Sequence, residues 1–192
     1  MATPLTLRIC TALIALFPCA AFADVWQGDQ HSGALRFVAT QAGAKFQGHF
    51  GEFKVRFDFN PAEPAKGSLD VTIVTKSADT ADAERDEVLH GQDFFWVVRF
   101  PEAKYHAAGF KRDGKGWIAA GELTLRGVTQ PVAVRFELKP KAQRLGMKGG
   151  VTLRRLEFGV GQGDWAETTW IGNPVDVAFD ISLLKETAAA SP

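Results

Sequence analysis

Apolar and polar residues alternate with a period of two along much of this chain. In "FKVRFDFN" (residues 53–60) every second residue is apolar, and the same spacing recurs in residues 131–138 and 174–184. Such alternation gives each strand one apolar and one polar face, as in antiparallel sheets rather than in buried parallel ones. Further strands with weaker patterns are predicted in residues 44–50, 69–73, 116–125 and 151–160.

A single helix is predicted, in "DTADAERDEVLHG" (residues 79–91), with Thr80 as its N-cap and Gly91 after its last turn. One short helix cannot cover a large sheet, so the strands must bury their apolar faces on each other. Long strands favour an all-β, antiparallel up-and-down barrel of about eight strands over a sandwich. Such a barrel can be filled by its own side chains or hold one small ligand. The predicted connections are turn-rich: "NPAEPAKG", "FKRDGKG", "LRGVTQP", "KPKAQRLGMKGG" and "GVGQGDW".

The first 23 residues have the three-part pattern of a cleavable secretory signal peptide. Arg8 is followed by an apolar run from Ile9 to Phe17, and "AFA" precedes the acidic Asp24. The apolar run is shorter than the ~20 residues of a membrane span. A lipoprotein anchored at Cys19 fits less well, because Phe17 and Pro18 stand where small residues are expected. We therefore predict cleavage after Ala23 and a periplasmic mature protein.

Removing this segment changes the composition that matters for the fold. Both cysteines, Cys10 and Cys19, lie in the signal peptide, so the mature chain has no internal disulfide. The remaining 169 residues carry 21 basic and 22 acidic side chains without a clustered basic footprint, which argues against a nucleic-acid surface. Residues 24–185 are predicted to form one domain and residues 186–192 a flexible tail.

No strong catalytic or metal-binding motif is found in the sequence. The four histidines (His31, His49, His90 and His106) are widely spaced and lack a zinc-type pattern. Asp86 and His90 are four residues apart on the predicted helix and could form an acid/base pair, but a helix-surface contact explains them as well. We predict no catalytic residue, no metal and no cofactor.

Aromatic residues are the compositional anomaly. The mature chain holds thirteen Phe and five Trp residues, and "DFFWVVRFPEAKYH" (residues 93–106) alone contains five aromatic rings directly after the predicted helix. Phenylalanine fills a solid core well, but large rigid rings also line pockets for long apolar ligands. Periodicity does not separate these two interpretations.

Several motifs in fixed order resemble the YceI-like family of exported bacterial proteins. They are found across nearly the whole mature chain: Trp26 and His31-Ser32; Arg85-Asp86, Leu89 and Gly91; Asp93-Phe94-Phe95; Phe100-Pro101-Glu102-Ala103; "GELTL" (121–125) with "GVT" (127–129); and Arg155 with Glu157-Phe158-Gly159.

The resemblance implies a lipocalin-like barrel with a tunnel for a long polyisoprenoid or similar lipid, such as a polyprenyl pyrophosphate or a quinone. It also implies a periplasmic carrier without an established catalytic mechanism, linked to base or acid stress. The partners that the same resemblance implies are a second copy of the chain and a cytochrome b561-type membrane redox protein.

On this hypothesis, inward aromatic rings surround the apolar tail and arginines bind the head group, because a guanidinium can bond two phosphate oxygens at once. Arg126 is a further head-group candidate, and Arg155 is predicted to be a buried partner of Glu157 or Asp86. Two alternatives stay open: a small enzyme that uses Asp86, His90 or Glu102, and a solid barrel that docks to a membrane redox partner. The predicted ligand-binding residues are Phe37, Phe46, Phe57, Arg85, Phe94, Phe95, Arg99, Phe136, Phe158 and Phe179.

Overall fold

The computed structural model describes residues 24–186, so the predicted signal peptide and residues 187–192 lie outside the described part of the chain. Within residues 24–186, no helix is long and apolar enough to span a membrane. The one α-helix of this range is α1 (Ala83–His90), and short 3₁₀ helices cover Pro64–Lys66, Thr75–Ser77, Arg155–Phe158 and Gly163–Ala166. The strands are β1 (Asp24–Asp29), β2 (Gly33–Gln41), β3 (Ala44–Phe50), β4 (Phe53–Phe59), β5 (Ser68–Val74), β6 (Ala78–Asp79), β7 (Glu102–Asp113), β8 (Gly116–Leu125), β9 (Val128–Lys141), β10 (Arg144–Arg154) and β11 (Pro174–Lys185).

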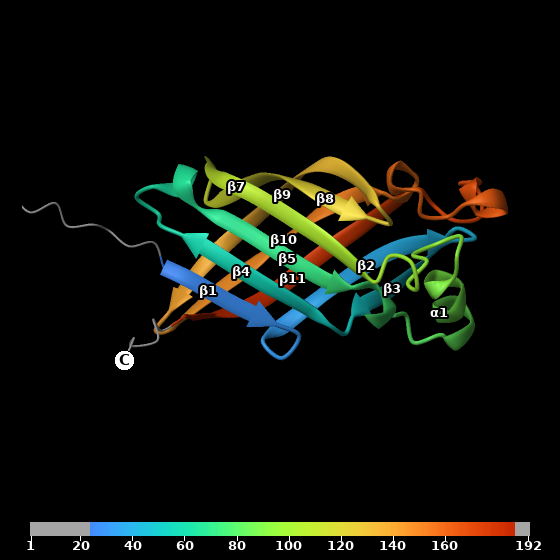
Figure 1. Cartoon of the computed structure of the whole chain (residues 1–192), viewed down its shortest axis with the longest axis horizontal. Coiled ribbons are helices and arrows are strands. Elements are labelled where there is room, and N and C mark those ends of the chain that lie inside the picture. Colours follow the sequence, from blue (N-terminus) through green and yellow to red (C-terminus); the bar gives the residue numbers. More distant parts are fainter. Residues whose placement is uncertain (1–23, 187–192) are drawn as a thin grey trace, which may run out of the picture.

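These strands close into one antiparallel barrel (Figure 1). β11 pairs with β2 along its first half and with β1 near its end, where Trp26 lies opposite Lys185, so β1 and β2 together act as one bent barrel strand. β3 and β4 form the next bent strand in the same way, because β3 pairs with β2 and β4 pairs with β1. With β5 and β7 to β11, the ring has eight strand positions. The predicted barrel of about eight strands with one short helix near one end is confirmed.

The period-two pattern sets which side chains enter the barrel. In β4, the four apolar residues Phe53, Val55, Phe57 and Phe59 are buried, whereas the intervening Lys54 and Arg56 are exposed. β4 therefore contributes one apolar row to the interior and one polar row to solvent, as the alternation predicts, and β7 and β9 repeat this pattern over much of their length.

Several predicted element ends are wrong. The N-cap of α1 is Asp82, whose side chain accepts a hydrogen bond from Arg85 N, while Thr80 precedes the helix and bonds to Asp86. The segment predicted as a strand through residue 160 leaves β10 after Arg154 and turns into a 3₁₀ helix. The turn-rich segment 139–150 is mostly strand, since β9 and β10 form a tight hairpin around residues 142–143. The Gly and Lys residues of this segment are typical of loops, but pairing with distant strands places most of the segment in β9 and β10.

A packed aromatic cluster fills the end of the barrel where β1 begins, on the left in Figure 1. Neighbouring rings in this cluster have centroids 4.9–5.9 Å apart, and all are buried. This end of the barrel is therefore solid, and we call the cluster the aromatic plug. Its members are Phe57, Phe59, Phe110, Trp117 and Phe136.

Candidate functional site

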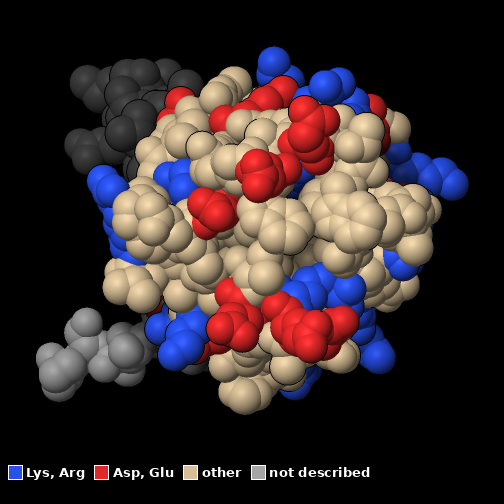
Figure 2. Space-filling view, turned by 90° about the vertical axis from the view of Figure 1, so that its right-hand side faces the viewer, with Lys and Arg blue, Asp and Glu red and all other residues tan. Residues whose placement is uncertain are grey.

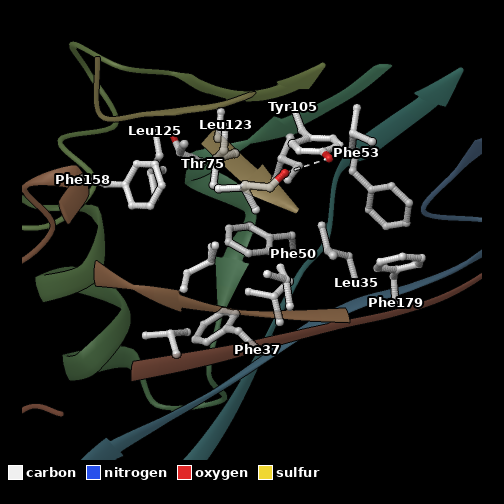
Figure 3. Close-up of a pocket in the computed structure, with 18 of the residues that line it drawn as sticks. Leu35, Phe37, Phe50, Phe53, Thr75, Tyr105, Leu123, Leu125, Phe158 and Phe179 are labelled. Carbon is white, nitrogen blue, oxygen red and sulfur yellow. Dashed lines mark hydrogen bonds between the residues drawn. The ribbon is translucent and has the colours of Figure 1, made fainter. Parts of the chain in front are cut away.

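An apolar cavity of about 200 Å³ lies between the aromatic plug and the α1 end of the barrel. The lining comes from inward positions of nearly every barrel strand, from α1 and from the segments that follow α1 and β10. Figure 3 shows rings and aliphatic side chains, among them Phe37, Phe50 and Leu123, around this space. Because alternating strands place one apolar row inside, the barrel wall needs no special motif to build such a lining.

Three lining side chains carry polar atoms, and the protein itself engages all of them. Thr75 Oγ1 donates to the Phe100 carbonyl at 2.8 Å. Tyr105 Oη lies 2.8 Å from the Ala119 carbonyl and 3.1 Å from the Val132 carbonyl, and burial raises the pKa of Tyr105 to about 12. Arg155 is the third. With these groups satisfied, the cavity offers a ligand mainly apolar contact.

Arg155 is buried and bonds to main-chain carbonyls rather than to an acid. Its Nε, Nη1 and Nη2 atoms donate to the carbonyls of Gly172, Val160 and Ile171 at 2.8–3.0 Å. Desolvation by burial lowers the pKa of the guanidinium below its usual value. The predicted partnership with Glu157 or Asp86 is wrong: Glu157 lies 3.9 Å from Arg154, and Asp86 accepts from Thr80. Arg155 therefore fixes the segment between β10 and β11 against the barrel.

The aromatic segment after α1 covers the other end of the cavity. Leu89, Phe94 and Phe95 are buried and line the cavity, and Phe95 N donates to the Leu89 carbonyl at 3.0 Å. The Asp93 carbonyl accepts from the N–H groups of Gly161 and Gln162 at 2.7 and 2.9 Å, which ties this segment to the one after β10. Figure 2 faces this end and shows mainly uncharged side chains across its centre, with charged ones around them.

The structure divides the predicted aromatic ligand-binding residues into two groups. Phe57 and Phe136 lie in the aromatic plug and do not line the cavity. The predicted aromatic residues that do line the cavity are Phe37, Phe46, Phe94, Phe95, Phe158 and Phe179. The alternating pattern predicts which strand residues point inward, but it carries no information on their depth along the barrel.

The predicted head-group arginines do not line the cavity. The guanidinium of Arg85 lies 4.4 Å from the ring centroid of Phe46, a cavity residue, and Arg85 Nε donates to Thr80. Arg99 stacks on Trp96, with 4.7 Å between Cζ and the ring centroid. Arg126 donates to the Gln92 carbonyl at 2.8 Å. Of the three, Arg85 is separated from the cavity by a single ring.

Comparison with known proteins agrees with this architecture. The family model of the YceI-like domain matches residues 26–183. The chain belongs to the YceI-like family. A UPF0312 protein of Photorhabdus laumondii is 41% identical over 91 residues, which are 47% of this chain and 47% of that protein, so the match spans about half the length of this curated relative.

Solved structures show the same fold. BcnA of Burkholderia cenocepacia is 25% identical with a TM-score of 0.78, and the match covers 81% of this chain and 98% of BcnA. A polyisoprenoid-binding domain from Saccharophagus degradans is 12% identical with a TM-score of 0.65, over 85% of this chain and 99% of that domain. The predicted family resemblance is confirmed.

The candidate acid/base residues of this YceI-like chain are dispersed. Asp86 accepts from Thr80, His90 Nε2 lies 3.0 Å from the Ala78 carbonyl, and Glu102 pairs with Lys104 at 2.9 Å. None of these three acid/base candidates lines the cavity. Residues 24–186 also contain no group of three or more His, Cys, Asp or Glu side chains that could hold a metal ion.

Sequence reasoning missed the aliphatic and polar parts of the lining. Thr75 comes from the 3₁₀ helix after β5, Tyr105 from β7 and Ile171 from the segment between β10 and β11, and local periodicity marks none of them as part of a binding site. Tyr105 could have been noticed as the chain's single tyrosine within an alternating apolar row.

Proposed function

We propose that this protein is an exported lipid-binding protein that holds a long isoprenoid-type chain in the barrel cavity. The observation that carries the proposal is the lining, whose polar atoms on Thr75, Tyr105 and Arg155 are already bonded to main-chain carbonyls. An apolar chain in this cavity gains about 0.8 kcal/mol for each CH₂ group removed from water. A polar ligand would find few free partners and lose its own hydration.

The isoprenoid class and the export route rest on two further observations. The Saccharophagus degradans domain, which shares this fold, is described as polyisoprenoid-binding. Residues 1–23 of this chain have the pattern of a signal peptide, which supports a periplasmic location. Pairing of two copies and contact with a b561-type membrane redox protein stay predictions of the family resemblance.

Binding can be tested on the protein purified from the periplasmic fraction of bacteria that express the whole chain. Native mass spectrometry should show an added lipid mass, and organic extraction should release a compound of that mass. The protein should also take up retinol, a fluorescent isoprenoid alcohol, with enhanced fluorescence.

Two neighbouring substitutions on β11 provide a matched control. Val177→Phe adds a ring to the cavity and should reduce the bound lipid severalfold, whereas Ala178→Phe adds the same ring to the exposed face and should have little effect. Absence of lipid from both the extract and the spectrum, together with no retinol uptake, would contradict the proposed function.

A further inference from the structure

The barrel wall is split between β9 and β10 near the α1 end. Pairing between the two strands stops at Arg135 and Gly150. Beyond this point, residues 128–134 pair only with β8 and residues 151–154 only with β11, within the part of the chain that the structure describes. A space of about 460 Å³ lies between these two strand segments, and we call it the β9–β10 fissure.

Two glycines stand where the strands separate. A Cβ atom on Gly149 would lie 2.2 Å from the Arg135 carbonyl oxygen, and one on Gly150 would lie 2.5 Å from the Val177 carbonyl oxygen. Only glycine fits this close approach of three strands. The Gly149-Gly150 pair therefore marks the last two residues of β10 that pair with β9.

The fissure and the cavity share a wall of side chains. Val132, Val151, Leu153 and Phe158 line both spaces, and Phe158 is seen at one side of the cavity in Figure 3. No strand ladder crosses this wall, so opening it requires side-chain movement but no loss of sheet hydrogen bonds. The one hydrogen bond found across the fissure in the described chain is long, at 3.4 Å from Gln130 Nε2 to the Glu157 carbonyl.

The two ends of the cavity are closed more firmly. The aromatic plug fills one end. At the other, Asp93 accepts two short main-chain hydrogen bonds and Phe94 packs on Trp165 with 5.5 Å between ring centroids. A ligand that enters through the ends disturbs these contacts. A ligand that enters through the fissure displaces Phe158, which is itself buried, and its apolar neighbours, but breaks no main-chain hydrogen bond of the sheet.

The chemistry of the fissure suits a polar head group. The edges of β9 and β10 that face it lack strand partners over residues 128–134 and 151–154, so they present main-chain donors and acceptors. The nearby guanidinium groups already have acidic neighbours, since Arg135 Nε lies 3.0 Å from Asp113 and Arg154 Nε lies 3.9 Å from Glu157. This favours a neutral head that donates and accepts hydrogen bonds, such as a hydroxyl group.

We infer that the β9–β10 fissure is the side entrance of the cavity and the site of the ligand's head group. The apolar chain passes Phe158 into the cavity, while the head stays between the unpaired edges of β9 and β10. This inference rests on the proposed function and adds a route and a head-group class to it.

Stopped-flow fluorescence with retinol tests the entrance. Ala133 lies in the fissure with an exposed side chain, and Ala133→Trp should slow retinol association by about tenfold. Ala178→Trp, on the exposed face of β11 outside the fissure, should leave the rate within about twofold. Gln130→Ala should act in the opposite direction and raise both association and dissociation rates, because it removes the hydrogen bond across the fissure.

Two cysteine variants test the entrance even if Ala133→Trp does not fold. Cys10 and Cys19 both lie in residues 1–23, so in protein from which this segment has been cleaved Ala133→Cys and Ala178→Cys each provide one site for a maleimide-linked polymer after folding. The label at residue 133 should slow retinol entry and the label at residue 178 should not. Equal rates for the two labelled proteins would overturn the side entrance.

The head-group site is tested with anhydroretinol, which lacks the hydroxyl group. The unsubstituted protein should bind retinol severalfold more tightly, and Ala133→Trp should lose this preference. Equal affinity for both ligands in the unsubstituted protein would overturn the head-group assignment. Failure of the unsubstituted protein to bind either ligand would instead overturn the proposed function, and the entrance with it.

Discussion

The ring of Phe37 lies against the main chain of Gly48, its partner across the β2–β3 ladder. A Cβ atom on Gly48 would lie only 2.2 Å from Cζ of Phe37. Because glycine leaves this space free, the Phe37 ring can lie along the barrel wall while it lines the cavity. The space inside the barrel therefore depends in part on the absence of a single methyl group.

Gly48→Ala should consequently weaken ligand binding. The methyl group forces the Phe37 ring from the wall toward the cavity, and the strain should lower the free energy of unfolding by about 1–3 kcal/mol. Retinol titration and urea denaturation measure the two effects. Gly146→Ala is the matched control on β10, because its Cβ atom would meet no atom closer than 3.4 Å. Unchanged retinol affinity in a folded Gly48→Ala protein would contradict this account of the cavity.

Arg155→Met should destabilise the protein far more than Arg154→Met. The first change leaves the carbonyls of Val160, Ile171 and Gly172 without their charged donor, which should lower the free energy of unfolding by about 3 kcal/mol or more. Arg154 is exposed and lies 3.9 Å from Glu157, so its replacement should change stability by about 0.5 kcal/mol or less. Urea denaturation of both variants gives the comparison, and similar losses would show that the carbonyl contacts contribute little.

The barrel could be predicted from the sequence, but the boundary between the plug and the cavity could not. Phe46 and Phe57 occupy equivalent inward positions of the same alternating pattern, yet Phe46 lines the cavity and Phe57 lies in the plug. Their depth depends on how distant strands are staggered around the ring, which local periodicity does not encode.

Arg155 and the fissure show a second limit. Acidic side chains such as Glu157 are visible partners in a sequence, but carbonyl groups belong to every residue, so the bonds of Arg155 leave no sequence signal. Gly149 and Gly150 predict a turn by composition. In the structure they lie inside β10 and mark the point where it separates from β9.

Tyr105 should make stability depend on pH in the alkaline range. Its pKa is raised by burial from 10.0 to about 12, so between these values the folded protein keeps a proton that the unfolded chain has lost. The free energy of unfolding should therefore be unaffected by this group below pH 10 and fall by about 2–3 kcal/mol as the pH rises to 12.

Lysines also titrate in the alkaline range, so Tyr105→Phe is needed to separate the contribution of Tyr105 to the pH dependence of stability from theirs. The variant should lose about 1 kcal/mol at neutral pH, because the hydroxyl no longer bonds to the Ala119 or Val132 carbonyl. Its stability should then decline less steeply above pH 10. Since Tyr105 is the chain's single tyrosine, tyrosinate absorbance reports its ionisation directly. Ionisation of the folded protein near pH 10 would contradict the prediction.

Phe57→Ala and Phe179→Ala should separate stability from binding. Phe57 is fully buried in the plug, in contact with Phe59, Phe110 and Phe136, so its removal should lower the free energy of unfolding by about 3–5 kcal/mol. Phe179 is half-buried and lines the cavity, so its removal should cost about half of that or less. Retinol affinity should change in the opposite order, with the larger loss in Phe179→Ala, because its ring faces the ligand. Measurement of both quantities in both variants decides the assignment: a Phe57→Ala protein that stays folded but loses most of its affinity would place Phe57 in the binding site after all.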